Sequence, residues 1–239
     1  MIRRMHCIGL LCACAIAPQV GFAQERATEN ARAELRLQVV SSLPGHHRTA
    51  PAVAWLEPLP GTPALPFASH GPYTLVQKNR TFRPHLLVIP AGSVVEFPNE
   101  DPFFHNVFSL FEGKRFDLGL YEAGSSKSVT FSRPGASYIF CNIHPEMSAV
   151  ILALTTPLYA IADAGDAFVL AGIPPGDYKL HLWIEGVPQS YLNGMTRSVH
   201  IASRNVDLGT LSAPIARPGS TMHNNKFGNP YNVNSQPSY

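Results

Sequence analysis

The feature that most restricts the fold is a series of short alternating or continuous apolar runs, each bounded by Pro, Gly, Asn or Asp. Such runs are typical of β-strands, and no helical period longer than two turns follows the first 23 residues. The sequence therefore predicts an all-β fold. The expected strands are Leu35–Val40, Ala52–Glu57, Tyr73–Gln77, Leu86–Ile89, Ser93–Phe97, Asn106–Leu110, Ser128–Phe131, Ser137–Cys141, Ala149–Leu154, Leu158–Ala162, Ala167–Leu170, Tyr178–Trp183, Arg197–Ile201 and Val206–Leu211.

Two breaks in composition divide these strands. The first is a stretch too rich in proline to be a central strand, which predicts a stiff connector. The second is Thr155-Thr156-Pro157, so that a block at 73–156 has its own set of strands, with two strands before it and five after it. The tail at 213–239 is rich in Pro, Gly, Ser and Asn without periodicity, which predicts disorder. The prolines of the connector are Pro58, Pro60, Pro63, Pro66 and Pro72.

The first 23 residues have the features of a secretory signal peptide. Arg3 and Arg4 are followed by an apolar run at 7–17, which is too short to span a bilayer, and by a small-x-small cleavage site that ends at Ala23. We therefore expect an exported protein, most simply a bacterial periplasmic one. An alternative is a lipoprotein box at 11–14 that would place a lipid on Cys14, but the apolar stretch before it is short for that purpose.

Removal of the signal changes the cysteine count and the charge. Three of the four cysteines lie in the first 14 residues, so the mature chain keeps only Cys141. An internal disulfide and a zinc site built on a cysteine pair are thereby excluded. Lys and Arg then number 18 − 2 = 16 against 16 Asp and Glu, and a neutral chain gives no electrostatic reason to expect nucleic acid or an anionic membrane. The longest mature apolar stretch, Ala149–Leu154, is far too short for a membrane span.

The remaining cysteine begins a group of metal-binding residue types. Cys141, His144 and Met147 follow one another at intervals of three residues, and His105 lies 36 residues upstream at the start of an expected strand. A thiolate, two imidazoles and a thioether suit copper, which cycles between Cu(I) and Cu(II), and they are the ligand set of blue-copper electron-transfer sites. Each residue alone is more often an inert thiol, an ordinary histidine or a core methionine, but one metal site accounts for all four together.

These residues resemble those of the cupredoxins over 73–156. The C-x-x-H-x-x-M loop is similar in length to that of amicyanin, and the stretch from Val94 to Asn99 is similar to the segment that carries the first copper histidine. The resemblance implies a Greek-key β-sandwich with one type 1 copper held by the four residues named above. It also implies supporting hydrogen bonds from Asn99 and from Asn106, the latter to the cysteine loop.

The same resemblance implies a docking surface for a redox partner around His144, formed by Phe103, Phe104 and Pro145. Glu146 departs from the apolar loop usual in such proteins and weakens this expectation.

The flanking strands resemble a different family. The turn-strand-turn-strand at 165–180, with Pro174-Pro175-Gly176-Asp177 at its second turn, is similar to carboxypeptidase regulatory-like and transthyretin-like β-sandwiches. Such modules open with two strands like those expected before the connector. The resemblance therefore implies a cupredoxin inserted into a smaller, discontinuous sandwich at 33–60 and 157–212, an arrangement similar to proteins often labelled methylamine utilization proteins.

These patterns predict a one-electron carrier that acts between redox partners and is not an enzyme. Two alternatives belong to other classes. A copper carrier or sensor would bind and release the metal without a redox partner, and would lose copper readily to a chelator. A structural or ligand-binding sandwich with a vestigial copper site would keep its binding after loss of the Cys141 thiol.

Overall fold

The computed structural model describes residues 32–41, 50–110, 114–202, 204–214, 225–227 and 229–230. The predicted signal peptide and Cys14 lie outside these residues, as does most of the predicted tail. Nearly all of the described secondary structure is β, which confirms the predicted fold class. The single described helix is α2 (Gln189–Met195), and it is too short to cross a membrane.

One β-sandwich is formed by strands from the two ends of the described chain. One of its sheets has the order β14-β1-β17, from β1 (Ala33–Ser41), β14 (Ala167–Ile173) and β17 (Val206–Ala213). The other has the order β13-β2-β15-β16, from β2 (Ala52–Pro58), β13 (Tyr159–Ile161), β15 (Gly176–Ile184) and β16 (Arg197–Ile201). We call this unit the outer sandwich. Its buried side chains form one continuous core, which includes Tyr178, Leu180 and Leu182.

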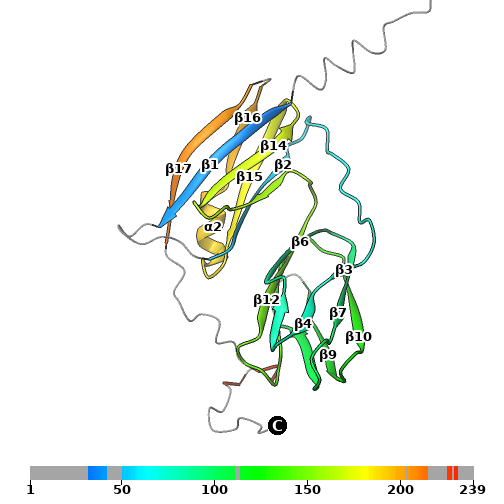
Figure 1. Cartoon of the computed structure of the whole chain (residues 1–239). Helices are drawn as coiled ribbons and strands as arrows, with labels where there is room; N and C mark the ends of the chain where they lie inside the picture. The colour runs from blue at the N-terminus through cyan, green and yellow to red at the C-terminus, as the bar shows by residue number, and fades with distance from the viewer. Residues whose placement is uncertain are drawn as a thin grey trace, which may run out of the picture.

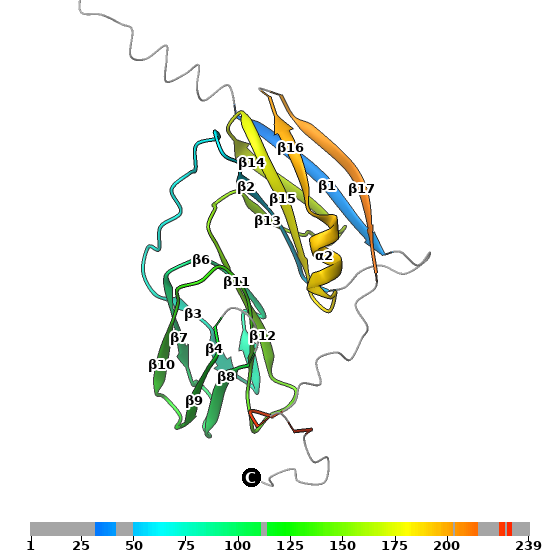
Figure 2. The same ribbon diagram turned by 180° about the vertical axis from the view of Figure 1, so that it is seen from behind.

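A second sandwich is made of the strands between β2 and β13, and it therefore interrupts the outer sandwich in sequence (Figures 1 and 2). Its larger sheet has the order β6-β12-β11-β8-β9, from β6 (Leu86–Pro90), β8 (His105–Ser109), β9 (Phe116–Tyr121), β11 (Gly135–Phe140) and β12 (Ser148–Leu154). The facing sheet, β10-β7-β3, comprises β3 (Tyr73–Thr74), β7 (Ser93–Pro98) and β10 (Ser126–Phe131). A hairpin of β4 (Val76–Lys78) and β5 (Thr81–Arg83) completes what we call the inner sandwich. The boundaries expected at 60, 73, 157 and 212 stay a prediction.

Both faces of β12 are buried, which explains its uninterrupted apolar sequence. Successive side chains of a strand point to opposite faces. Ala149, Ile151 and Ala153 accordingly enter the core of the inner sandwich, whereas Val150 and Leu152 pack between the two sandwiches.

The outer sandwich meets this second face of β12 with Val53 of β2 and Trp183 of β15, both buried. An ionic contact lies beside the apolar interface, where the His85 Nε2 atom is 2.9 Å from the Glu185 carboxylate. The His85 Nδ1–H donates to the Ser148 carbonyl at 3.1 Å. Because both ring nitrogens face acceptors, the pKa of His85 is raised, chiefly by its hydrogen bond to Glu185.

The proline-rich connector runs along one side of both sandwiches (Figure 1). Two hydrogen bonds hold it there: the Leu59 N–H donates to the Asp177 carbonyl at 2.8 Å, and the Asp177 N–H donates to the Thr62 side-chain Oγ1 at 2.8 Å. The side chain of Phe67 packs against the interface between the sandwiches. The connector is therefore part of the packed structure as well as a link.

Two strands and one helix were not expected from the sequence. In β9 the pattern is interrupted at Gly119, whose φ of +67° accompanies a shift of register against β8. A glycine in the left-handed region at such a bulge breaks the apolar alternation that identifies a strand. The other unpredicted elements, β5 and α2, are too short to show a period.

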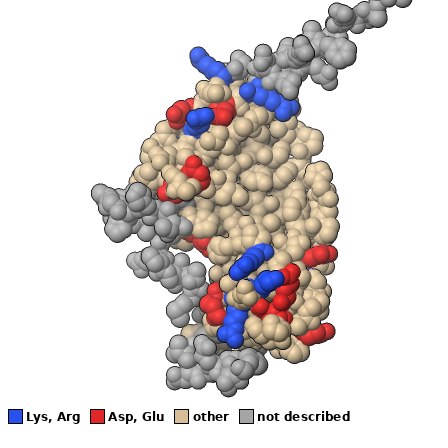
Figure 3. Space-filling model, in the orientation of Figure 1, with Lys and Arg blue, Asp and Glu red and all other residues tan. Residues whose placement is uncertain are grey.

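Charged side chains of both signs lie in two groups, one over each sandwich, and much of the surface between them is uncharged (Figure 3). On the face shown, the groups contain both Lys or Arg and Asp or Glu.

Candidate metal centre

The predicted ligands meet at one end of the larger sheet of the inner sandwich. His105 is the first residue of β8, and Cys141 directly follows β11. These strands are antiparallel neighbours with Phe108 opposite Phe140, so the start of one lies beside the end of the other. The loop at 141–147 joins β11 to β12 and carries Cys141, His144 and Met147.

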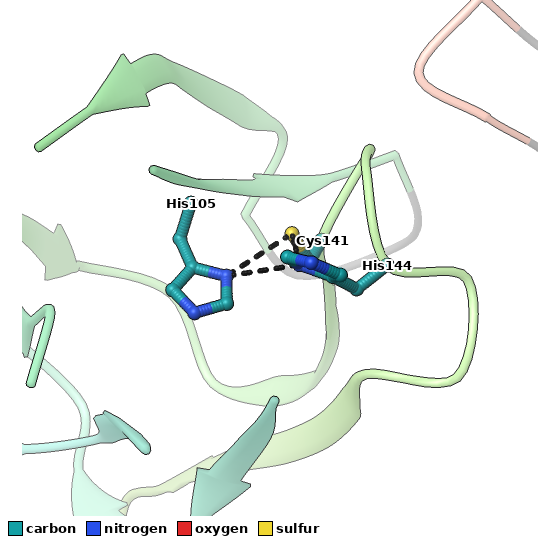
Figure 4. Close-up of side chains that lie close together, drawn as sticks. All are labelled: His105, Cys141 and His144. Carbon is teal, nitrogen blue, oxygen red and sulfur yellow. Dashed lines mark hydrogen bonds between the residues drawn. The ribbon is translucent and has the colours of Figure 1, made fainter. Parts of the chain in front are cut away.

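Three donor atoms converge within this arrangement (Figure 4). The Cys141 Sγ atom is 3.7 Å from His105 Nδ1 and 3.6 Å from His144 Nδ1. The two Nδ1 atoms are 3.1 Å apart. All three residues are buried, and among the described residues they form the one group of three or more such side chains whose ligand atoms lie within 4.8 Å of one another.

These separations fit a metal ion at the centre of the group. Bond lengths of about 2.0 Å to nitrogen and about 2.3 Å to sulfur, as at zinc, place a sulfur and a nitrogen about 3.7 Å apart when the ligands are trigonal. The two sulfur–nitrogen distances have that size. The shorter nitrogen–nitrogen distance corresponds to a narrower angle between the imidazoles. The arrangement thus directs one sulfur atom and two imidazole nitrogen atoms at a single point.

Burial sets the protonation of the three groups without metal. It raises the pKa of the Cys141 thiol, although hydrogen bonds from the backbone amides of Asn106, Ile143 and His144 oppose this change. It lowers the pKa of His105 and of His144, and the charge of His105 adds to the effect at His144. At neutral pH the site therefore holds a protonated thiol and two neutral imidazoles, which is a neutral arrangement suited to a buried position.

Met147 is placed on the same loop and is buried, with 1% of its surface exposed. Its backbone N–H donates to the His144 carbonyl at 3.0 Å, and its carbonyl accepts from the Cys141 N–H at 3.3 Å. The loop is thus closed on itself by hydrogen bonds, and the thioether belongs to the core cluster that also contains Cys141.

Asp101 is a site residue that the sequence analysis missed. Its Oδ2 atom accepts from His105 Nε2–H at 2.8 Å, and both residues are buried. The same carboxylate accepts the backbone N–H groups of Asn79 at 2.6 Å and Arg80 at 2.9 Å. These two residues form the turn between β4 and β5 and have φ values of 55° and 54°, which is the geometry of a two-residue hairpin turn. Asp101 therefore fixes the His105 tautomer with its Nδ1 lone pair toward Cys141.

Asn99 holds the backbone that leads to His105. Its Nδ2 donates to the carbonyls of Phe103 at 2.8 Å and Tyr121 at 3.3 Å, and its Oδ1 accepts from the Asp101 N–H at 3.1 Å. An asparagine that bonds the backbone two residues later is a common turn device. The side chain of Asn99 is buried and so replaces solvent for these groups.

Asn106 lies between the ligand strand and the cysteine loop. Its Oδ1 accepts from the Asn142 N–H at 3.3 Å, and its Nδ2 donates to Asp117 Oδ1 at 2.7 Å. Asn106 directly follows His105, and Asn142 directly follows Cys141. The contact therefore ties the two ligand-bearing segments together.

The residues expected to form a docking surface differ in exposure. The Phe103 ring packs against both imidazoles, with centroid distances of 5.2 Å to His105 and 5.6 Å to His144. Phe104 is 53% exposed. Pro145 is half-buried, and His144 is only 6% exposed.

No protein-family model and no curated protein matches the sequence. Solved structures similar to part of the chain include a purple cupredoxin from Nitrosopumilus maritimus, at 21% identity and a TM-score of 0.32 over 34% of this chain and 99% of that one. A copper-containing nitrite reductase from Thermus scotoductus is similar at 29% identity and a TM-score of 0.34, over 41% of this chain and 25% of that enzyme. A variant of amicyanin is similar at 18% identity and a TM-score of 0.34, over 36% of this chain and 86% of that one.

Proposed function

We propose that this chain is an exported type 1 copper protein of the cupredoxin kind, which carries single electrons between redox partners. The observation that supports this function best is the convergence of a buried thiol and two buried imidazoles on one point. Copper bound by His105, Cys141, His144 and Met147 would supply a reversible one-electron couple.

The protein groups make such a site suited to electron transfer. Loop hydrogen bonds, Asp101 and Asn99 hold the donors in place without metal, so that little rearrangement is needed when the charge of the site changes. Burial keeps water from the donors, which favours an electron carrier over a chaperone that must hand over its metal. Phe104, Pro145 and the edge of His144 are proposed to face the partner.

The direct test is to load the protein that lacks residues 1–23 with Cu(II). One equivalent is expected to produce an intense blue or purple thiolate-to-copper absorption, and a chelator is expected to remove the metal slowly. A colourless protein that prefers Zn(II) would refute the type 1 site. Rapid and complete loss of copper to the chelator would instead favour the copper carrier.

The charge of Asp101 is expected to lower the reduction potential of the bound copper. A carboxylate that accepts from a ligand imidazole raises the basicity of that ligand and favours the more highly charged metal. The change Asp101→Asn should therefore raise the potential by several tens of millivolts, since a tenfold change in relative affinity corresponds to about 59 mV for one electron. Cyclic voltammetry measures this shift.

Glu100→Gln is a matched control for Asp101→Asn. Glu100 is the adjacent carboxylate, but it pairs with Lys78 at 2.8 Å and has an exposed side chain. Its removal takes away the same charge from the same loop without touching His105. Equal shifts in the two variants would mean that general charge, and not the hydrogen bond to His105, sets the potential.

Copper affinity is expected to increase with pH. Burial raises the pKa of the Cys141 thiol and lowers those of His105 and His144, so metal binding near pH 7 displaces one proton, that of the thiol. Between pH 6.5 and pH 8 the apparent Cu(I) affinity should rise about tenfold for each pH unit. Competition with a chelator of known pH dependence measures the slope. A flat profile would mean that the thiol is already ionised in the metal-free protein.

A further inference from the structure

A ring of four residues joined by hydrogen bonds lies beside the metal-binding loop, and one member comes from near the end of the chain. The Lys226 Nζ atom donates to Asp117 Oδ2 at 2.9 Å, and the Lys226 backbone N–H donates to Asn142 Oδ1 at 2.9 Å. The ring is closed by the contacts of Asn106 with Asp117 and with the Asn142 N–H. Lys226 is 84 residues from Asn142 and 109 from Asp117 in sequence.

The segment that presents Lys226 has a defined turn. The Asn225 N–H donates to the Asn229 carbonyl at 2.8 Å, while Asn225 Oδ1 accepts from the N–H groups of Phe227 at 3.0 Å and Asn229 at 3.1 Å. An asparagine side chain that bonds following backbone groups is a strong turn former. The turn leaves the Lys226 N–H and ammonium group directed at the inner sandwich.

The electrostatics of the contact are consistent with this placement. The hydrogen bond from Lys226 lowers the pKa of Asp117, together with those from the Gly119 N–H and Asn106, against the opposing effect of burial. Asp117 therefore stays ionised, and it accepts hydrogen bonds from the Asn106 side chain, the Gly119 N–H and the Lys226 ammonium group. The ring is closed only while Lys226 is in place.

We propose that residues 225–227 form an intramolecular clasp that holds the metal-binding loop in its ligand-bearing conformation, with Lys226 as a positioning residue. Asn106 directly follows the ligand His105, and Asn142 directly follows the ligand Cys141. The ring thus restrains the backbone beside two ligands, on a part of the site that Asp101 does not contact. The inference rests on the proposed function for its effect on copper, whereas its effect on the loop is independent of metal.

The clasp acts locally. A partly exposed ion pair adds little to the stability of a whole protein, but hydrogen bonds to a loop govern how often that loop opens. Loss of the clasp should therefore leave the melting temperature nearly unchanged and increase the opening rate of the loop. More frequent opening gives a chelator access to the copper.

The test compares two variants with one control. A chain without residues 225–239 removes the clasp, and Lys226→Met removes the ammonium group while keeping an unbranched side chain. Lys179→Met in β15 of the outer sandwich is the matched control, because it removes an exposed lysine far from the ring. If the truncated chain folds poorly, Lys226→Met still tests the clasp in the full chain.

The first measurement is hydrogen exchange of the Asn142 backbone amide in metal-free protein. We expect about tenfold faster exchange in both clasp variants and no change in the control. The second is the rate of copper transfer to a chelator, which should also rise about tenfold. Loss of a residue that supports the metal ligands typically changes metal affinity by about 10- to 100-fold, and this value is at the lower end of that range. Exchange and transfer rates equal to those of the control would overturn the clasp.

The two measurements separate the clasp from the proposed function. Faster amide exchange in a protein that binds no copper would support the clasp and refute the copper site. A blue protein in which neither clasp variant alters exchange or release would overturn the clasp and leave the copper function in place.

Discussion

Cys141→Ser is expected to abolish the intense visible absorption of the copper-loaded protein. The absorption arises from the bond between a thiolate and Cu(II), and serine has no low-energy sulfur electrons to supply it. Copper affinity should fall by more than the 10- to 100-fold typical of changes outside the ligand shell, because a ligand itself is lost. Visible spectroscopy and chelator competition measure the two effects.

The fold should survive this change at a modest cost. Cys141 is fully buried, and burying a hydroxyl in place of a thiol costs about 1–3 kcal/mol when its hydrogen bonds are incomplete. For a domain pair of this size that equals a fall in melting temperature of about 2–4 °C per kcal/mol. If the colour is lost and the melting temperature falls by no more than this, the loss of colour is caused by removal of the thiolate ligand and not by unfolding.

Met147→Leu is the comparison variant for Cys141→Ser. It removes the thioether from the same loop but keeps the thiol and both imidazoles, so the colour should persist. A Cys141→Ser protein that keeps the charge-transfer band, or a Met147→Leu protein that loses it, would contradict the ligand assignment.

Trp183→Ala is expected to have the largest effect on stability. Trp183 is 2% exposed and packs with Val53, Leu152 and Leu154 between the two sandwiches, with its Nε1–H 3.4 Å from the Tyr138 hydroxyl. Truncation of a buried tryptophan costs about 3–5 kcal/mol because it removes apolar contacts and leaves a cavity. The melting temperature should fall by about 6–20 °C at the same scaling.

The position of Trp183 also predicts how unfolding changes. Because the apolar contact between the sandwiches is weakened in this variant, the two sandwiches should unfold more independently than in the parent. Calorimetry should then resolve two unfolding transitions. Copper colour should be unchanged, since the strand alternation of β11 directs Tyr138 to the interface and Cys141 to the opposite face.

Val169→Ala is the control for Trp183→Ala. Val169 is 47% exposed on β14, and surface changes of this kind usually alter stability by less than about 0.5 kcal/mol. If Trp183→Ala melted within about 2 °C of the parent in a single transition, the interface would not contribute to coupling between the sandwiches.

Three of the four candidate ligands that the sequence indicated are close together along the chain. Cys141, His144 and Met147 lie on one loop of seven residues, so their spacing alone brings them close. Most strands were also identified, because the alternation of apolar residues records which face each side chain takes. The burial of both faces of β12 came from the structure, and it explains the continuous apolar run of that strand.

The supporting contacts of the site were not visible in the sequence. Asp101 is four residues before His105, but its contact depends on the backbone folding back around Asn99 and on two amides of a distant hairpin turn. Lys226 lies in a segment whose composition predicts disorder, and its partners are more than 80 residues away. No pattern in the neighbouring sequence indicates the role of Asp101 or Lys226, because the hydrogen bonds of each depend on how several separate loops fold.

The sequence by itself therefore determined the all-β class, the alternation of apolar residues along most strands and a set of soft metal-binding side chains that includes the single cysteine of residues 24–239. The tertiary structure decided which buried faces meet, where Val150 and Leu152 pack against Trp183, and how Asp101 and Lys226 surround the site. The physical reason is that alternation and ligand spacing are set by neighbouring residues along the chain. Packing between sandwiches and hydrogen bonds across loops are set only when distant segments come together.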